Sequence, residues 1–468
     1  MFASLSGRLQ NRHKTKLTIL IIFFASGAAG LIYEVIWTRM LTLVFGSTVF
    51  AVTTVLTSFM AGLALGSFYF GRRADEQERP LRTYSYLEAG IGVFALIFPI
   101  ILILLNGVYV GIYRQINASF YPLSLIRFVL SFLVLLVPTT LMGATLPIIS
   151  KFFVSRLENL GWDVGRLYSL NTFGAVVGTI AAGFFLVKWF GVDWTLRLSA
   201  AINLIIAGIA ILLDKQWVSV RAMNCATTNS AANGAINCAT TNPLIVQLAL
   251  WAFAASGFCA LAYEVLWTRI LVFFVGSTTY AFATMLSAFL FGIAAGSFIF
   301  ARIADLPYFR EKLQHQVSIL GVVQISIGLS AIALLPAFSE LYAIRVGLPA
   351  GRFWSFISCL VVMILPTTLM GASFPLVTRI YTFNLNKLGR SIGNIYSINT
   401  VGAILGSFIA GFILIPLIGI QKSVVLIASV NTIMGCLLIA LNPQANRRFR
   451  LSGIISAALI IIFSNLFM

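Results

Sequence analysis

The sequence has few charged residues, few histidines and few cysteines. Charged side chains make up 9% of its 468 residues, whereas soluble domains average about 25%. Two histidines give no basis for a zinc site, and five scattered cysteines give no disulfide framework. An ordinary soluble domain is therefore excluded, and we expect neither a bound metal nor a cofactor.

Long apolar runs take the place of the missing charge. The chain is 60% hydrophobic and its mean hydropathy is +0.99. Many windows reach the ~18 apolar residues that a helix needs to cross about 30 Å of hydrocarbon. The pattern predicts an all-α polytopic membrane protein, whose surroundings are the lipid bilayer.

The excess of basic residues indicates topology. Lysine and arginine number 31 against 13 acids, and most of them fall in alternate loops of the hydropathy pattern. Basic residues stay on the cytoplasmic side of membrane proteins. We therefore expect no nucleic-acid partner, and we place the basic N-terminus in the cytoplasm.

The chain carries an internal repeat. Residues 33–39, YEVIWTR, return as 263–269, YEVLWTR, and residues 138–144, PTTLMGA, return as 366–372. The order of the matching segments is the same in both copies. Two like halves around a membrane axis are the commonest construction of a secondary transporter.

Each half is predicted to cross the membrane six times, which gives both copies the same orientation. The first half has spans at 17–45, 49–71, 84–105, 125–149, 167–189 and 194–213. The second has spans at 244–275, 279–301, 316–339, 354–378, 394–416 and 422–441, and a short thirteenth span is expected at 452–468. The fold class is therefore two parallel six-helix repeats plus one C-terminal span.

Four regions follow from this pattern. Residues 1–213 form the first membrane repeat, and 244–441 form the second. Residues 214–243 between them are predicted to be a flexible cytoplasmic linker, and 442–468 hold a basic stretch and the short last span. The first span would be ~43 Å long as a helix, so it is either strongly tilted or broken near Glu34.

The repeated Tyr-Glu-x-x-Trp-Thr-Arg segment places charged groups inside apolar spans. Its members are Tyr33, Glu34, Trp37 and Arg39, and then Tyr263, Glu264, Trp267 and Arg269. An ionised group there costs at least ~2.5 kcal/mol unless it is paired or hydrated. One interpretation is a substrate contact or gate, with Glu34 pairing with Arg269 and Glu264 with Arg39. The other is an interfacial anchor or structural pair.

Glu88 breaks the symmetry, because the matching position in the second half is Gln324. A carboxylate in one half only is what proton coupling or cation binding requires. The alternative is a structural glutamate that pairs with a loop arginine such as Arg82.

Two asparagines, Asn171 and Asn399, precede glycines spaced four or five residues apart. Small residues at this spacing let helix backbones approach closely, and a buried amide can hydrogen-bond across the contact. We expect helix packing at these positions, and a lining of a polar cavity is the alternative.

The loops after the second and eighth spans end in Ala74-Asp75 and Ala304-Asp305. Here the sequence resembles the major facilitator superfamily, which carries a Gly-x-x-x-Asp signature with basic residues in this loop. The resemblance implies that Asp75 and Asp305 cap a helix or bridge basic groups at a cytoplasmic gate. Arg79 and Arg82, or Arg310 and Lys312, are the basic residues expected to serve.

The YEVxWTR, PTTLMGA and YSxNTxGA stretches together resemble the membrane part of fused major-facilitator/spermidine-synthase proteins. Members of that group often continue into a soluble aminopropyltransferase domain. No strand–glycine-loop–helix unit for a nucleoside cofactor follows residue 441. We therefore expect a membrane module without enzyme activity.

Two functions are consistent with these features. The first is a secondary transporter of the bacterial inner membrane with alternating access, carrying a polyamine or another small cationic metabolite that meets Glu34, Glu264 and Glu88. The second is a non-transporting scaffold that docks a separate soluble aminopropyltransferase.

Overall fold

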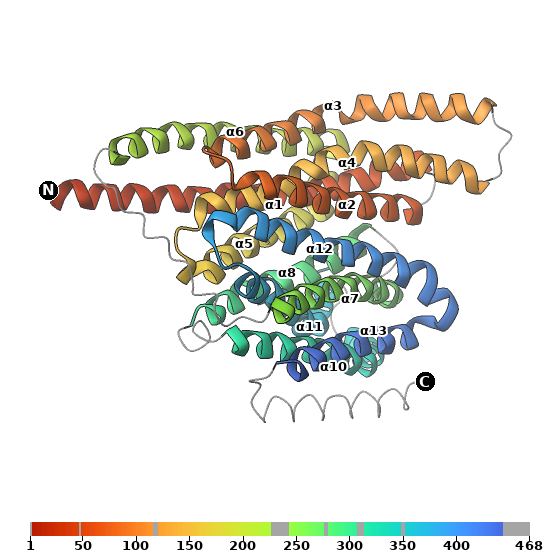
Figure 1. Ribbon diagram of the computed structural model, residues 1–468. Coiled ribbons are helices and arrows are strands. Elements are labelled where there is room, and N and C mark those ends of the chain that lie inside the picture. Colours follow the sequence, from red (N-terminus) through yellow and green to blue (C-terminus); the bar gives the residue numbers. More distant parts are fainter. Residues whose placement is uncertain are drawn as a thin grey trace. The chain divides into compact units, whose positions relative to one another are not determined.

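A computed structural model describes residues 2–45, 48–115, 120–225, 243–275, 279–306, 313–347 and 352–442. Every regular element in these ranges is a helix (Figure 1). The first repeat contains α1 (Phe2–Phe45), α2 (Thr48–Ala74), α3 (Pro80–Gln115), α4 (Phe120–Phe153), η1 (Leu157–Asn159), α5 (Leu160–Ile180), η2 (Ala181–Leu186) and α6 (Val187–Cys225).

The second repeat has the same order of elements. It contains α7 (Pro243–Val275), α8 (Thr279–Ala304), α10 (Leu313–Gly347), α11 (Arg352–Tyr381), η4 (Leu385–Lys387), α12 (Leu388–Phe408), η5 (Ile409–Leu414) and α13 (Ile415–Ala440). Even the short π-helical segments η2 and η5 recur at matching places. The duplicated sequence therefore folds into duplicated local structure.

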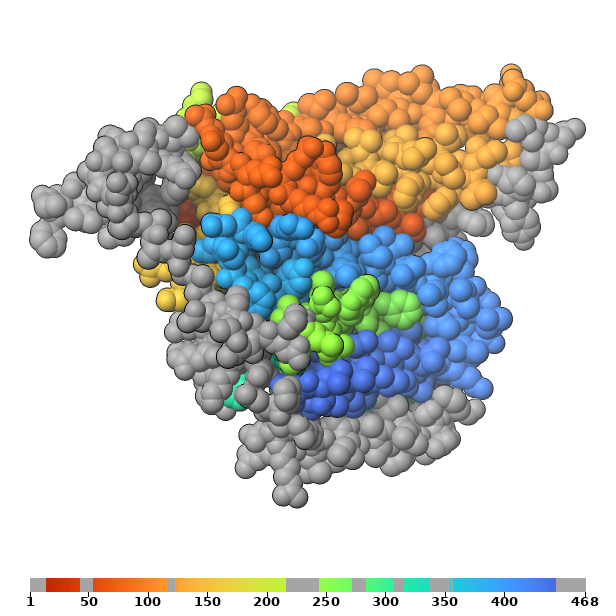
Figure 2. Space-filling view, in the orientation of Figure 1, coloured from red at the N-terminus to blue at the C-terminus, as the bar shows by residue number. Residues whose placement is uncertain are grey.

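The helices form two compact units. Unit 1 comprises residues 1–153 and 173–233, and unit 2 comprises 154–172 and 234–468. The boundary runs through α5, so its first turns pack with unit 2. On one face of unit 2, α7 lies between α12 and α13 (Figure 2).

Ten segments among the described residues are long and apolar enough to cross a membrane. Two of them, 157–215 and 385–440, hold 59 and 56 residues. A straight helix of that length would reach more than 80 Å, against about 30 Å of hydrocarbon. Each contains one glycine with non-helical backbone angles, Gly191 at φ 74° and Gly419 at φ 78°. Only glycine adopts such angles readily, so these residues mark where the helix breaks.

The contacts in unit 1 show that the chain reverses at Gly191. Helix α5 runs in the same direction as α1, and so does α3, whereas α6 runs opposite to α3. The contacts that set these directions are Phe24 with Gly174, Ala28 with Gly178, Ser26 with Glu88, Trp37 with Phe98, Gly92 with Ala200, and Ser85 with Ala207. The first long segment therefore forms two helical legs of opposite direction, as expected for two of the six spans in this repeat.

Two sequence expectations need adjustment. Helix α1 continues from Phe2 to Phe45 without interruption, so the first span is not broken near Glu34. Helix α6 continues to Cys225, so the first part of the expected linker, 214–225, is helical. The rest of the linker, 226–242, and the basic stretch and last span after residue 442 lie outside the described residues.

Close glycine contacts join α2 to α4 and α8 to α11. A Cβ on Gly66 would lie 1.9 Å from the Thr140 carbonyl oxygen, and one on Gly296 would lie 1.8 Å from that of Thr368. The PTTLMGA motif thus supplies the backbone on which the glycine-containing helix rests, which is a packing role.

Candidate functional site

Tyr33 and Trp37 lie on one face of α1, because residues four apart share a helix face. Both side chains are fully buried, and their rings stack with centroids 5.2 Å apart and planes 12° apart. Phe59 of α2 and Phe98 of α3 pack on Trp37 at 6.4 and 5.2 Å. The aromatic part of the repeated motif therefore forms part of the hydrophobic core of unit 1.

A polar network begins at the same tyrosine. The Tyr33 hydroxyl donates to Asn203 Oδ1 at 2.9 Å, and Asn203 Nδ2 donates to Glu88 Oε2 at 2.5 Å. Ser26 Oγ donates to Glu88 Oε1 at 2.6 Å. Helices α1, α3 and α6 are thus joined at one buried point.

Unit 2 repeats the aromatic pair but not the acid. Tyr263 and Trp267 stack at 5.1 Å and 14°, and Asn431 Nδ2 donates to the Tyr263 hydroxyl oxygen at 3.4 Å. The buried Gln324 donates from Nε2 to Ser373 Oγ at 3.2 Å. A neutral amide therefore stands where unit 1 has Glu88.

Glu34 and Glu264 are 5% and 7% exposed, whereas Arg39 and Arg269 are exposed. Five residues along one helix turn the side chains about 140° apart, so neither glutamate pairs with the arginine of its own motif. Among the described residues the Glu34 carboxylate has neither a hydrogen bond nor an ion pair, which is unusual for a buried acid. The pairs Glu34–Arg269 and Glu264–Arg39 remain a prediction.

Glu88 does not pair with Arg82. The Arg82 guanidinium donates from Nε to the Tyr86 hydroxyl oxygen at 2.8 Å on the exposed side of α3. Glu88 lies six residues further along and is fully buried. The loop-arginine alternative is therefore wrong, because the two side chains point about 120° apart around the helix and Glu88 meets Ser26 and Asn203 instead.

Asn399 contributes to helix packing. Its Nδ2 donates to the Phe253 carbonyl oxygen of α7 at 2.8 Å. Three residues further along α12, a Cβ on Gly402 would lie 2.0 Å from the Ala254 carbonyl oxygen, so the backbones of α12 and α7 are in contact. Asn171 lies half-buried at the matching position of α5.

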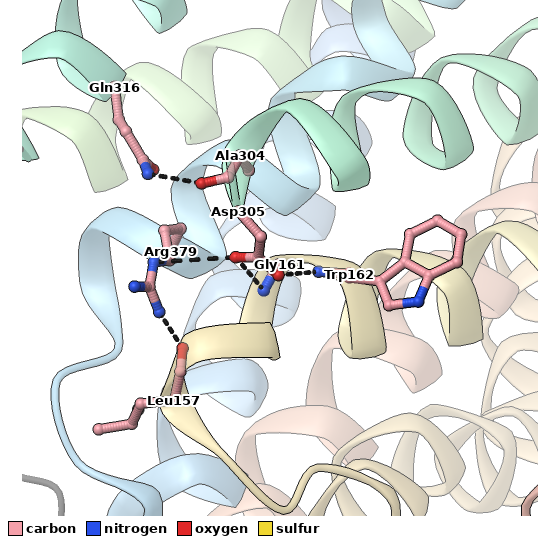
Figure 3. Close-up of polar contacts among 7 residues, drawn as sticks. All are labelled: Leu157, Gly161, Trp162, Ala304, Asp305, Gln316 and Arg379. Atoms are coloured by element: carbon pink, nitrogen blue, oxygen red, sulfur yellow. Dashed lines mark hydrogen bonds and ion pairs between the residues drawn. The ribbon is translucent and has the colours of Figure 1, made fainter. Parts of the chain in front are cut away.

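Asp305 is held at the end of α8 by backbone amides of α5. It accepts from Trp162 N at 2.6 Å and Gly161 N at 3.1 Å, and its ion pair with Arg379 Nε measures 3.9 Å (Figure 3). Arg379 also donates to the Leu157 carbonyl oxygen. The carboxylate thus caps the N-terminus of a helix, where negative charge is favoured.

Burial raises the pKa of Asp305 from 3.8 to about 6. The Trp162 amide, Arg379 and the Gly161 amide act in the opposite direction, and they offset only part of the desolvation. In unit 1 the corresponding Asp75 pairs with Lys151 at 3.4 Å.

The basic partners of these two aspartates were missed from the sequence. We expected the loop arginines Arg79 and Arg82, but the observed partners lie at the ends of α4 and α11. Lys151 and Arg379 are 228 residues apart, the same offset as the PTTLMGA copies. A basic residue that recurs at the same position of both repeats was the sequence signal that could have identified these partners. Arg310 and Lys312 lie outside the described residues.

No group of three or more histidine, cysteine, aspartate or glutamate side chains comes together in the part of the chain that the structure describes. The polar residues that do converge are the glutamate, amide and hydroxyl groups of the spans. Such a set can bind a proton or contact a small cation, and it lacks the ligands that a transition metal requires.

Comparison with known proteins identifies the fold. A bacterial homologue of the iron transporter ferroportin, in an outward-facing state, has a TM-score of 0.58 at 14% identity, covering 91% of this chain and 98% of that one. The major facilitator transporter FucP, in the outward conformation, has a TM-score of 0.53 at 13% sequence identity, and the match covers 92% of this chain and 98% of that one. The proton:xylose symporter XylE, bound to 6-bromo-6-deoxy-D-glucose, has a TM-score of 0.54 at 13% sequence identity, and the match covers 94% of this chain and 99% of that one.

Sequence comparison gives a weaker result. No protein-family model matches the chain. Polyamine aminopropyltransferase 1 of Streptomyces coelicolor is 23% identical over 196 residues, which is 42% of this chain and 33% of that protein. This chain therefore matches about a third of the length of that relative. The structural likeness, over nearly the whole chain, shows that the protein is a multi-pass membrane protein with a major-facilitator-type fold.

Proposed function

We propose that the chain is a secondary transporter that works by alternating access between its two repeats. The observation that carries this proposal is the buried Glu34, a carboxylate inside a membrane span without a partner among the described residues. A charge at such a depth costs about 2.5–3.5 kcal/mol or more. A scaffold gains nothing from that cost, whereas a transporter uses it to attract a cation.

A small cationic metabolite, with polyamines as the first candidates, is the substrate class that we propose. Glu34 and Glu264 supply the carboxylates that would attract such a cation. The partial similarity to a polyamine aminopropyltransferase supports the same class. Arg39 and Arg269 would balance the carboxylates when no substrate is bound.

The bacterial inner membrane, with the N-terminus in the cytoplasm, is the location that we propose. Support comes from the basic residues in alternate loops, which stay on the cytoplasmic side.

Uptake by proteoliposomes tests the transport proposal. Radiolabelled putrescine and spermidine should accumulate in vesicles that contain the full chain, and Glu34→Gln and Glu264→Gln should each reduce the initial rate at least about tenfold, since a lost charge contact is worth about 1.4 kcal/mol or more. Glu78→Gln, at an exposed loop position, is the matched control and should be unchanged. Absence of uptake of both amines by the wild-type chain would contradict the proposed substrate class.

The second candidate function is a membrane module that docks a separate soluble aminopropyltransferase. The partial match to such an enzyme favours it. Co-purification of a soluble synthase with the full chain, together with no uptake of any amine, would support this function over transport. In that case Glu34→Gln should leave the amount of bound synthase unchanged, because Glu34 is buried.

A further inference from the structure

The network around Glu88 contains one acid and, in the described parts of the chain, no base. The carboxylate is fully buried on α3, and its two oxygens accept from Ser26 Oγ and Asn203 Nδ2. The titratable groups that face it are Tyr33 from α1 and Tyr84 from α3, while α6 contributes only the amide. Helix α4, which also packs on α3, presents no charged group to it among the described residues.

These surroundings accommodate an uncharged carboxyl group. The neutral groups Ser26, Asn203 and Tyr84 reduce the cost of burying a carboxylate, but they supply no countercharge. A carboxylic acid has one O–H to donate and one oxygen to accept, which the Ser26 hydroxyl and the Asn203 amide can satisfy by turning the serine hydroxyl. The surroundings of Glu88 therefore suit its protonated, neutral carboxyl group better than its carboxylate.

The same network leaves no cage for a metal cation. Each carboxylate oxygen already accepts one donor, and Asn203 Oδ1 accepts from the Tyr33 hydroxyl at 2.9 Å. Hard cations are held by about six or more oxygen ligands whose lone pairs converge on one point. Here the Asn203 amide presents an N–H to the carboxylate rather than an oxygen, so a proton is the cation that fits.

The second repeat provides an internal comparison. Gly92 of α3 contacts Ala200 of α6, and Gly328 of α10 contacts Ala428 of α13 in the same way. Four residues before each glycine stand Glu88 and Gln324 respectively. The two positions are therefore equivalent, and the described structure has one ionisable carboxyl group of this kind per molecule.

We propose that Glu88, with Ser26, Asn203 and Tyr33, forms a proton-binding site that couples transport to the proton gradient, an inference that rests on the proposed transport function. A proton from water binds to one carboxylate oxygen when the helices separate. The packed arrangement of α1, α3 and α6 holds the neutral acid. The proton returns to water on the other side, where the carboxylate left behind is hydrated.

The first experiment detects the proton without any substrate. Infrared difference spectra of the purified full chain between acidic and alkaline pH should show a protonated-carboxyl band that Glu88→Gln removes and Glu78→Gln retains. Ser26→Ala, which deletes a donor to the ionised form, should move the loss of this band to higher pH. A band that is unchanged in Glu88→Gln would overturn the proposal.

The second experiment measures coupling. A pH gradient, acidic outside, should drive amine accumulation in wild-type proteoliposomes, and Glu88→Gln should abolish this accumulation but keep gradient-independent exchange of labelled for unlabelled amine. Glutamine already occupies the matching position in unit 2, so this variant should fold. Gradient-driven accumulation in Glu88→Gln would overturn the proton site and leave transport standing. Absence of amine uptake in the wild type would contradict the proposed substrate class, and the infrared result would still decide whether Glu88 binds a proton.

Discussion

Glu34, Glu88 and Asp305 are acids in three different surroundings. Asp305 lies at a helix end with two amide donors and an arginine, Glu88 lies in a span with neutral donors only, and Glu34 is buried without a hydrogen bond among the described residues. The residue type is nearly the same in each case, so the neighbours decide the chemistry. The structure shows capping by Asp305, and proton binding by Glu88 and substrate contact by Glu34 are the roles that we propose.

Asp305 makes a pH-dependent contribution to stability. Its pKa in the folded chain is about 6, above the ordinary value of 3.8, so the folded state binds more protons between these two values. Stability from this group is therefore greatest below about pH 4 and declines as the pH rises to about 6, by at most about 3 kcal/mol.

Asp305→Asn should remove this decline and retain a side-chain oxygen to accept from Trp162. Thermal unfolding of the wild type and the variant in detergent at pH 4, 5 and 7 checks it. A wild-type profile with the same slope as that of Asp305→Asn would contradict the assigned cause.

At the scale of elements, close helix pairs are set by glycine. The α2–α4 and α8–α11 pairs bring backbone against backbone at Gly66 and Gly296. Replacing either glycine by a larger residue forces the two helices apart, because the added Cβ meets a backbone carbonyl oxygen rather than the end of a flexible side chain.

Gly66→Ala and Gly296→Ala should each lower the unfolding temperature by several degrees or prevent folding, because overpacking typically costs about 1–3 kcal/mol. Gly208→Ala is the matched control: it lies on α6 and a Cβ there meets nothing within 4 Å. Thermal unfolding followed by size-exclusion chromatography measures the effect. Equal stability of Gly66→Ala and Gly208→Ala would mean that this helix contact is looser than described.

The topology that we expect for the whole molecule rests on the helix breaks at Gly191 and Gly419 and on an even number of predicted crossings per repeat. Trp189 and Trp194 flank the reversal at Gly191 and are 65% and 64% exposed. Exposed tryptophans gather at membrane interfaces. The reversal is therefore expected at the outer face, opposite the basic loops.

Labelling with a membrane-impermeant maleimide tests this arrangement. With Cys225 and Cys238 replaced by serine, Asp193→Cys should react in intact cells, whereas Glu78→Cys should react only after the membrane is opened. Both positions are exposed, so accessibility of the side chain is matched. The reverse pattern of labelling would invert the proposed orientation.

Much of the fold could be predicted because membrane crossing depends on length and hydropathy, which are local properties. The reversal at Gly191 falls between the spans 167–189 and 194–213 that the sequence predicted. The continuity of α1 was harder to predict, because a long tilted helix and a broken helix have the same hydropathy along the chain. The Lys151 and Arg379 partners were missed because each lies more than 70 residues from its aspartate.

The sequence by itself determined that this is a duplicated membrane protein, that Glu88 has a neutral counterpart and that acids occur inside its spans. Tertiary structure decided which groups these acids meet. The partners of Glu88 are Ser26 and Asn203, where the sequence suggested Arg82. Asp305 accepts hydrogen bonds from the backbone amides of Gly161 and Trp162. The physical reason is that charge and hydropathy are summed along the chain, whereas a hydrogen bond forms only between groups that packing brings within about 3 Å.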